Sequence, residues 1–313
     1  MPIDRRASTT HRRSLYGSVA LLAIFFLSAT SSAQQSTDDD EVLRVNTDLV
    51  VVNVTVTDSG GKYTRGLRRT DFTLLEDGHE QKLSIFGAEE TPFAAAVLLD
   101  FSGSMEKRVS LARAAAIRFL DGLREEDVAS VYRFDSEIEQ LQDYSPSRDL
   151  APIAFGLRAR GMTVLNDAIL RAADDLSRRP EKRRAIVVLS DGYDTRSSAS
   201  ADKALAAASN AGVTIYAVDM SAPETSSFQA RAQSAGTLRD FAEKSGGRYI
   251  STPGGQSLRE AFNSVLEELG NQYTLAYRPT NRARDGRWRQ IEVKLTRTEL
   301  VARTRKRYRA PKN

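Results

Sequence analysis

The stretch Asp100-Phe101-Ser102-Gly103-Ser104 joins an apolar run, residues 94–99, to a segment with helical periodicity. A short apolar run of this kind is typical of a buried strand in a parallel sheet. One carboxylate and two hydroxyls are therefore expected at the carboxyl end of a central strand, where open α/β sheets bind ligands. These oxygens are hard ligands, which suit a hard divalent cation. Taken alone, the stretch is more simply explained as a polar turn in which Ser104 caps the following helix.

Around this stretch, apolar runs alternate with segments of helical periodicity from residue 92 to residue 270. Buried strands are expected at residues 94–99, 185–189 and 213–218, a hairpin at 128–134 and 137–141, and helices at 112–123, 165–176, 201–208, 238–244 and 257–269. Strands that alternate with helices form a parallel sheet covered on both faces. The sequence therefore predicts an α/β domain with a doubly wound, mostly parallel sheet.

Two further polar segments occupy comparable places. Gly161-Met162-Thr163 precedes an expected helix, and Leu189-Ser190-Asp191-Gly192 ends an expected strand. Together with residues 100–104, they resemble the metal-ion-dependent adhesion site (MIDAS) of von Willebrand factor A (vWA) domains. The resemblance covers about residues 92–270. The segment Phe72-Thr73-Leu74-Leu75-Glu76-Asp77-Gly78 adds a resemblance to exported bacterial "vWA-related" proteins.

The resemblance implies a role for each matching residue. Ser102 and Ser104 would bind a divalent cation directly, and Thr163 directly or through water. Asp100 and Asp191 would act mostly through bridging waters. Because hydroxyls are neutral, the ion keeps much of its charge, and an Asp or Glu carboxylate of a protein partner can complete the octahedron that Mg²⁺ requires. Mg²⁺ is the expected cation, with Ca²⁺ and Mn²⁺ left open.

The segments that flank the α/β domain have β character. Val50, Val52, Val54 and Val56 share one strand face. Asp77-Gly78 favours a hairpin between residues 72–76 and 81–86. In the tail, residues 272–278 and 290–296 are expected to pair as a second hairpin, with a further strand at 302–308. We expect residues 43–91 and 271–313 to form one small antiparallel β-domain, a sheet with one packed face.

The first 33 residues have the form of a bacterial export signal. Arg12 and Arg13 precede an apolar core, residues 15–27, and Ser31 and Ala33 stand where a signal peptidase cleaves. Residues 34–42 are expected to be a flexible lead-in. The sequence thus predicts a periplasmic or extracellular protein with no membrane span after cleavage. An uncleaved anchor is the alternative.

Composition excludes several kinds of site. The 313 residues contain no cysteine and two histidines, which excludes disulfides and thiolate ligands and argues against histidine triads and multi-histidine metal sites. The net charge is only +4, and the basic cluster at 303–309 is interpreted as solvated charge, so no nucleic-acid partner is expected.

The leading functional hypothesis is a non-enzymatic adhesion or scaffolding module that recognises a partner carboxylate through a divalent cation. One alternative is a metal-dependent hydrolase or phosphotransferase, which lacks support because no histidine base stands beside a serine. Another is a structural envelope protein in which the metal only stabilises loops. Metal-dependent turnover of phosphoesters would favour the enzyme. A bound metal that no carboxylate of a partner can reach would favour the structural protein.

Overall fold

The computed structural model describes residues 49–88, 91–150, 159, 161–221, 227–252 and 254–312. The expected signal peptide, residues 1–33, and the expected lead-in, residues 34–42, lie outside the described residues. Within the described ranges, no helix has the length and apolar character needed to cross a membrane.

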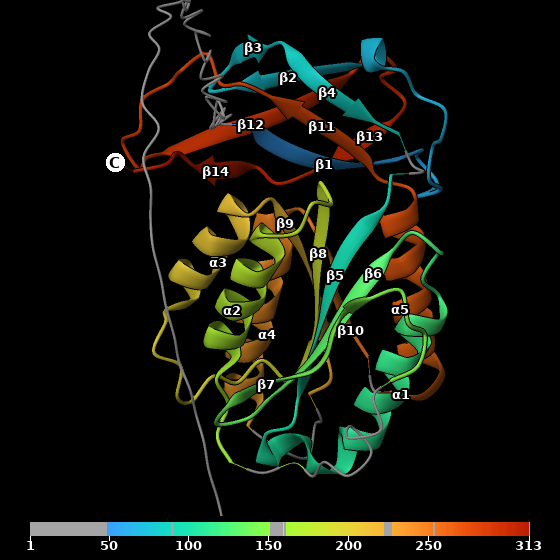
Figure 1. Ribbon diagram of the computed structural model, residues 1–313, viewed down its shortest axis with the longest axis vertical. Coiled ribbons are helices and arrows are strands. Elements are labelled where there is room, and N and C mark those ends of the chain that lie inside the picture. Colours follow the sequence, from blue (N-terminus) through green and yellow to red (C-terminus); the bar gives the residue numbers. More distant parts are fainter. Residues whose placement is uncertain are drawn as a thin grey trace, which may run out of the picture. The chain divides into compact units, whose positions relative to one another are not determined.

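A six-stranded sheet forms the centre of the α/β region (Figure 1). Its strands, in the order in which they lie, are β10 (Tyr249–Ser251), β9 (Val213–Asp219), β8 (Arg183–Ser190), β5 (Phe93–Asp100), β6 (Val128–Phe134) and β7 (Ile138–Ser145). All neighbouring pairs are parallel except β6 and β7, which form the expected hairpin at one edge. Every residue of β5 is buried, as the apolar run predicts for a central strand.

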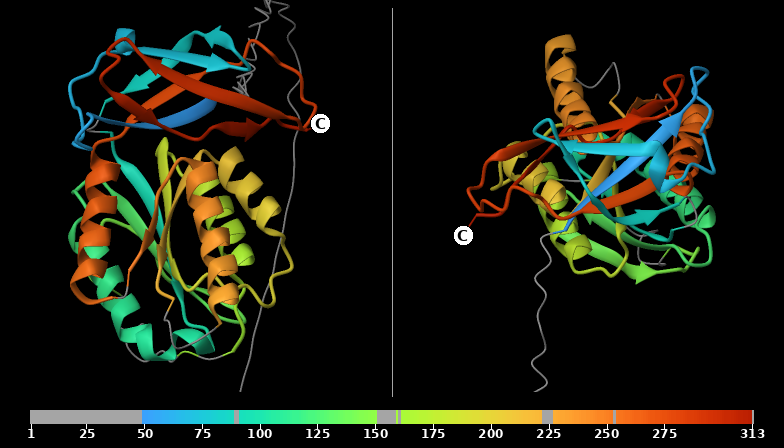
Figure 2. Two further views of the ribbon diagram at one scale, coloured as in Figure 1. Left: turned by 180° about the vertical axis from the view of Figure 1, so that it is seen from behind. Right: turned by 90° about the horizontal axis from the view of Figure 1, so that it is seen from above.

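Helices cover both faces of this sheet (Figures 1 and 2). One face packs against α1 (Val109–Asp121), which follows the 3-10 helix η2 (Gly103–Arg108), and against α5 (Gly255–Gly270). The other face packs against α2 (Leu165–Ser177), α3 (Ala201–Asn210) and α4 (Phe228–Ser245). The prediction of a doubly wound, mostly parallel α/β sheet is confirmed.

The order of the strands places a switch point beside β5. After β5 the chain builds β6 and β7 on one side, and then returns to build β8, β9 and β10 on the other. The carboxyl ends of β5 and β8 therefore diverge around one crevice, which is where open α/β sheets bind ligands. Figure 1 shows this edge at the bottom, away from the β-strands that gather at the amino ends.

The segments that flank the α/β region form an antiparallel β-domain of two four-stranded sheets. One sheet has the order β13 (Val301–Arg303), β1 (Val50–Thr57), β11 (Tyr273–Tyr277) and β4 (Leu83–Gly87). The other has the order β14 (Arg307–Arg309), β12 (Trp288–Leu295), β2 (Phe72–Glu76) and β3 (His79–Gln81), with the 3-10 helix η1 (Arg69–Asp71) before β2. The four alternating valines of β1 are buried in one apolar cluster with residues of both sheets. A small antiparallel β-domain built from both flanks is thus confirmed, but it is a sandwich rather than a single sheet.

The predicted pairing of the tail is wrong. Strands β11 and β12 do not form a hairpin, because β11 pairs with β1 and β4 on its two sides while β12 pairs with β2 and β14. Both edges of β11 are therefore occupied. The intervening residues 278–287 connect one sheet to the other instead of turning back within one.

The hairpin predicted at Asp77-Gly78 is correct at its turn and wrong beyond it. Both residues have positive φ, 47° and 81°, as a two-residue hairpin turn requires, and Glu76 pairs with His79. The returning strand ends at Gln81, and β4 joins the opposite sheet. The single strand expected at 302–308 is likewise divided into β13 and β14, which belong to different sheets.

Buried charges connect the β-domain to the α/β region. Glu268 of α5 is fully buried and accepts hydrogen bonds from Tyr216 Oη at 2.8 Å and Thr55 Oγ1 at 3.2 Å. The same carboxylate forms ion pairs with Arg303 at 2.5 Å and with Arg248 at 3.6 Å. Arg183, also fully buried, donates to the backbone carbonyl of Leu269 at 2.8 Å.

Candidate functional site

Asp100 ends β5 and is completely buried. Its Oδ1 atom accepts the backbone N–H of Ser102 at 2.8 Å, and its Oδ2 atom accepts the hydroxyl of Ser190 at 2.5 Å. The first bond shapes the turn after the strand, and the second joins the ends of β5 and β8. The carboxylate is therefore fixed in orientation at the switch point.

The two serines of the first segment lie next to Asp100. The Oγ atoms of Ser102 and Ser104 are 3.1 Å apart, and the Ser104 hydroxyl also bonds to Asp191. Ser104 lies within η2 and does not cap it; Ser102 occupies the N-cap position, with no capping bond from its side chain. The simpler explanation of Ser104 as a helix cap is therefore not what the structure shows. Ser102 is buried, whereas Ser104 is exposed at the surface.

The segment with Thr163 lies between the other two. The backbone carbonyl of Gly161 accepts the N–H of Gly103 at 3.3 Å, which links it to the first segment. Thr163 N–H donates to Thr195 Oγ1 at 2.9 Å, and Thr163 O accepts Thr195 N–H at 3.0 Å, which links it to the loop after Asp191. Thr163 itself is buried. The fold thus brings the three sequence segments together at one edge of the sheet.

Asp191 follows β8 directly and is nearly fully buried. Its Oδ1 atom accepts the N–H of Tyr193 at 3.3 Å. The intervening Gly192 has a φ of +80°, and a Cβ atom there would lie 2.6 Å from the carbonyl oxygen of Ser234. Glycine is therefore required at this position, because a side chain would force the loop away from α4.

The electrostatics of the site favour a cation. Burial and the charge of Asp191 raise the pKa of Asp100 to about 7. Burial, and to a lesser degree the charge of Asp219, raises the pKa of Asp191. Among the described residues, no lysine, arginine or histidine forms an ion pair with Asp100 or Asp191. Two buried carboxylates that repel each other, beside neutral hydroxyls, form a donor set that a divalent cation would neutralise.

Three residues at this edge have roles that the sequence did not reveal. Ser190 holds Asp100, Thr195 holds Thr163, and the buried Asp219 ends β9 next to Asp191. Asp219 accepts the hydroxyl of Tyr249 at 2.5 Å and the N–H of Ser221 at 2.7 Å. Asp219 could have been found in the sequence, because it directly follows the apolar run 213–218, as Asp100 follows the run 94–99.

Two other carboxylates near these loops are engaged by backbone. Asp194 accepts the N–H groups of Asn166 and Ser197, at 2.8 and 3.0 Å. Asp167 accepts those of Ser198 and Ala199, both at 2.8 Å. They fix the loop after β8 to the start of α2. In the part of the chain that the structure describes, no group of three or more His, Cys, Asp or Glu side chains is arranged to hold a metal. A metal centre here would therefore depend on hydroxyl ligands.

Comparison with known proteins gives partial matches to solved structures. A membrane protein of Bacteroides fragilis described as aerotolerance-related shares 16% identity and a TM-score of 0.46, over 56% of this chain and 98% of that one. BatB of Bacteroides thetaiotaomicron shares 17% identity and a TM-score of 0.47, with the same coverage of 56% and 98%. A von Willebrand factor type A protein of Catenulispora acidiphila shares 14% identity and a TM-score of 0.49, over 77% of this chain and 72% of that one. No curated protein matches the sequence.

A family model settles the classification. The model described as "VWA domain containing CoxE-like protein" matches residues 66–243, which is more than half of the chain. The matched range contains the whole carboxyl edge described above, from Asp100 to Asp219. The chain belongs to the family of VWA domain containing CoxE-like proteins.

Proposed function

We propose that this chain is an exported, non-enzymatic binding module that recognises a carboxylate of a protein partner through a divalent cation. Ser102, Ser104 and Thr163 would hold the cation, with Asp100 and Asp191 acting through waters. When bound, the cation supplies a positive charge with a position open to an outside ligand. Mg²⁺ is the expected ion.

The observation that carries this proposal is the pair of buried carboxylates, Asp100 and Asp191, which have no cationic partner among the described side chains. Burying uncompensated charge is costly, and a protein usually avoids it by pairing the charge or by binding a metal. Both carboxylates are held by hydrogen bonds from backbone or serine groups, which orient their oxygens without neutralising them. The arrangement is therefore suited to receive a cation.

The surroundings of the site support binding to a protein surface. Met162, beside Thr163, is 52% exposed, and Phe228, the first residue of α4, is 81% exposed. Phe228 follows the loop after β9, so both apolar side chains belong to the carboxyl edge. Exposed aromatic and methionine side chains are typical of protein interfaces. A partner carboxylate would bind the cation while apolar groups around it contact these two side chains.

The test is metal-dependent capture of a partner by the full-length chain. Binding from the native envelope fraction is compared in Mg²⁺ and in EDTA, and between the wild type and the Asp100→Ala variant. Asp240→Ala, which changes an exposed aspartate on α4, is the matched control. The proposal requires that EDTA and Asp100→Ala each abolish capture, and that Asp240→Ala leave it unchanged. Undiminished capture in EDTA and by Asp100→Ala would remove the proposal.

Export is the second part of the proposal, and it rests on residues 1–33. Arg12, Arg13, the apolar core at 15–27 and the small residues before Gln34 support it. N-terminal sequencing of the chain recovered from a bacterial periplasm or culture medium should begin at Gln34. Recovery of the intact N-terminus in the cytoplasm would contradict export, without bearing on the metal site.

A further inference from the structure

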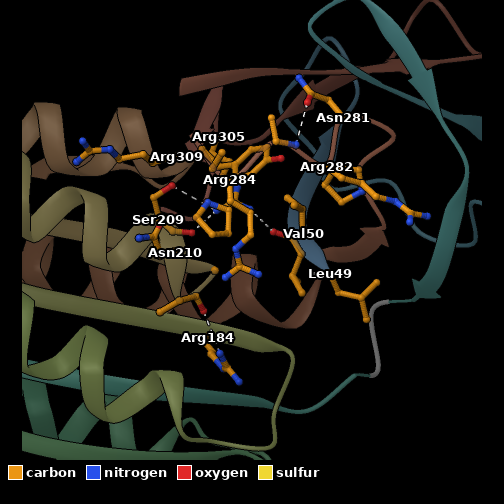
Figure 3. A pocket seen from close by; sticks show the side chains of 18 residues that line it. Leu49, Val50, Arg184, Ser209, Asn210, Asn281, Arg282, Arg284, Arg305 and Arg309 are labelled. Atoms are coloured by element: carbon orange, nitrogen blue, oxygen red, sulfur yellow. Dashed lines mark hydrogen bonds between the residues drawn. The ribbon is translucent and has the colours of Figure 1, made fainter. Parts of the chain in front are cut away.

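A second site lies at the opposite end of the sheet, where the β-domain meets α3. A pocket of about 380 Å³ is lined by residues 49–51 at the start of β1, by the end of α3 and the turn after it, and by two stretches of the tail (Figure 3). The pocket and the proposed metal centre lie at opposite ends of β8. Arg184, which lines the pocket, is near the start of this strand, and Asp191 directly follows its last residue.

The charged side chains that the structure describes in the lining of this pocket are all positive. Five arginines contribute to it, and none of the described aspartates and glutamates does: Arg184, Arg282, Arg284, Arg305 and Arg309. In Figure 3, Arg305 and Arg284 lie at the centre of the group, while the side chains of Arg282 and Arg309 extend away to either side. Arginines that gather around one cavity repel one another unless an anion is present.

Arg305 is the most deeply placed of the five, at 6% exposure. Its guanidinium donates to the backbone carbonyls of Ser209, at 2.5 Å, and Val51, at 2.6 Å, and its Nε atom is buried without a partner. Burial lowers its pKa to about 10. Carbonyl oxygens orient a guanidinium but do not cancel its charge.

Arg184 is held in the same way. Its guanidinium donates to the backbone carbonyls of Glu181, at 2.8 Å, and Ala211, at 3.0 Å, and burial lowers its pKa. The nearest carboxylate that acts on it is that of Glu181, which is paired with Arg179 at 2.8 Å. Near the tail residues of the pocket, Asp285 is paired with Arg289 at 3.0 Å. These two acids, Glu181 and Asp285, are thus engaged with arginines outside the lining.

We propose that this pocket binds a small anion that carries phosphate or carboxylate groups. The guanidinium group presents donors in a planar fork that matches both groups, and such charge-assisted bonds are stronger than neutral ones. The volume lies within the range of small-molecule sites. The site is independent of the proposed metal centre and would bind its ligand without a divalent cation.

The test is isothermal titration of the full-length chain in EDTA with inorganic pyrophosphate and, separately, with citrate, at constant ionic strength. The variant Arg282→Gln/Arg284→Gln removes two charges from the pocket, and Arg297→Gln is the control, since Arg297 is paired with Glu299 outside the pocket. We expect the double variant to bind at least about tenfold more weakly and the control to bind as the wild type does.

The two ligands distinguish the chemistry. Binding of pyrophosphate alone would indicate a phosphate site, and binding of both would indicate a general anion site. The proposal would be overturned if neither ligand bound the wild type, or if the wild type and the double variant bound the ligands equally well. Circular dichroism of each variant verifies that it folds.

Discussion

Two buried charge clusters at opposite ends of the same sheet differ in how they are neutralised. Beside the β-domain, Glu268 is paired with Arg303 and Arg248 and accepts bonds from Tyr216 and Thr55. At the carboxyl edge, Asp100 and Asp191 are also buried, but from the described residues they receive only backbone and serine hydrogen bonds. The first cluster is complete without an outside partner, so we interpret it as structural. The second has no cationic partner among the described residues, and buried carboxylates without such a partner are typical of a ligand site.

The strongest way to test this contrast is to remove one carboxylate from each cluster. Glu268→Ala leaves Arg303 without its buried partner and should lower the free energy of unfolding by about 3–5 kcal/mol. Asp100→Asn keeps an oxygen that accepts the Ser102 N–H and removes a negative charge that Asp191 repels. Without metal, this variant should therefore be at least as stable as the wild type at pH 8. Urea denaturation of both variants in EDTA provides the measurement. A large loss of stability in Asp100→Asn would show that the two clusters do not differ.

A second test uses pH. Because the pKa of Asp100 is raised to about 7 in the folded chain, the folded state holds this proton more tightly than the unfolded state. The metal-free chain should therefore lose stability as the pH rises from about 4 to about 7. Asp191, whose pKa is also raised, acts in the same direction. Asp100→Asn should show a flatter profile in EDTA. If the free energy of unfolding depended on pH in the same way in Asp100→Asn and in the wild type, Asp100 would not be the group responsible.

The smallest expected effect concerns a residue that supports the site from outside. Thr195 holds the Thr163 backbone at 2.9 Å, and Thr195→Val removes that acceptor. The loss should cost about 1 kcal/mol of stability and weaken Mg²⁺ binding about tenfold. Thr237→Val, which changes a half-buried threonine on α4, is the control. Equal Mg²⁺ affinity in the wild type and Thr195→Val, measured by calorimetry, would exclude this supporting role.

The sequence predicted the α/β region well because its signals are local. The apolar run before Asp100, and the run before Ser190, each define a buried strand and the polar turn that follows it. Parallel strands bring such turns to one edge automatically, so the meeting of the segments that hold Asp100 and Asp191 could be inferred from pattern. Thr163 precedes α2 and does not follow a parallel strand, so its place beside them was expected only from the resemblance to vWA domains. The role of Ser190 could not be inferred, since it depends on a contact between neighbouring strands.

The β-domain was predicted less accurately because strand partners are not a local property. Alternation places Val50 and Tyr273 on buried faces, but it does not state which strand lies beside which. The tail strands β11 and β12 follow each other in sequence, and yet β1 and β4 already occupy both edges of β11. Only the Asp77-Gly78 turn, with its two positive φ angles, fixed a pairing from sequence.

The central claim is that the carboxyl edge binds a divalent cation, and direct titration tests it most closely. Isothermal titration of the full-length chain with Mg²⁺ should give saturable binding at one site, and the Ser102→Ala/Ser104→Ala variant, which loses two hydroxyl ligands, should give none. Thermal unfolding should show Mg²⁺ stabilising the wild type by about 2.7 kcal/mol at one hundred times its dissociation constant, and leaving the variant unchanged. No binding of Mg²⁺, Ca²⁺ or Mn²⁺ by the folded wild type, or equal binding by the variant, would contradict the claim.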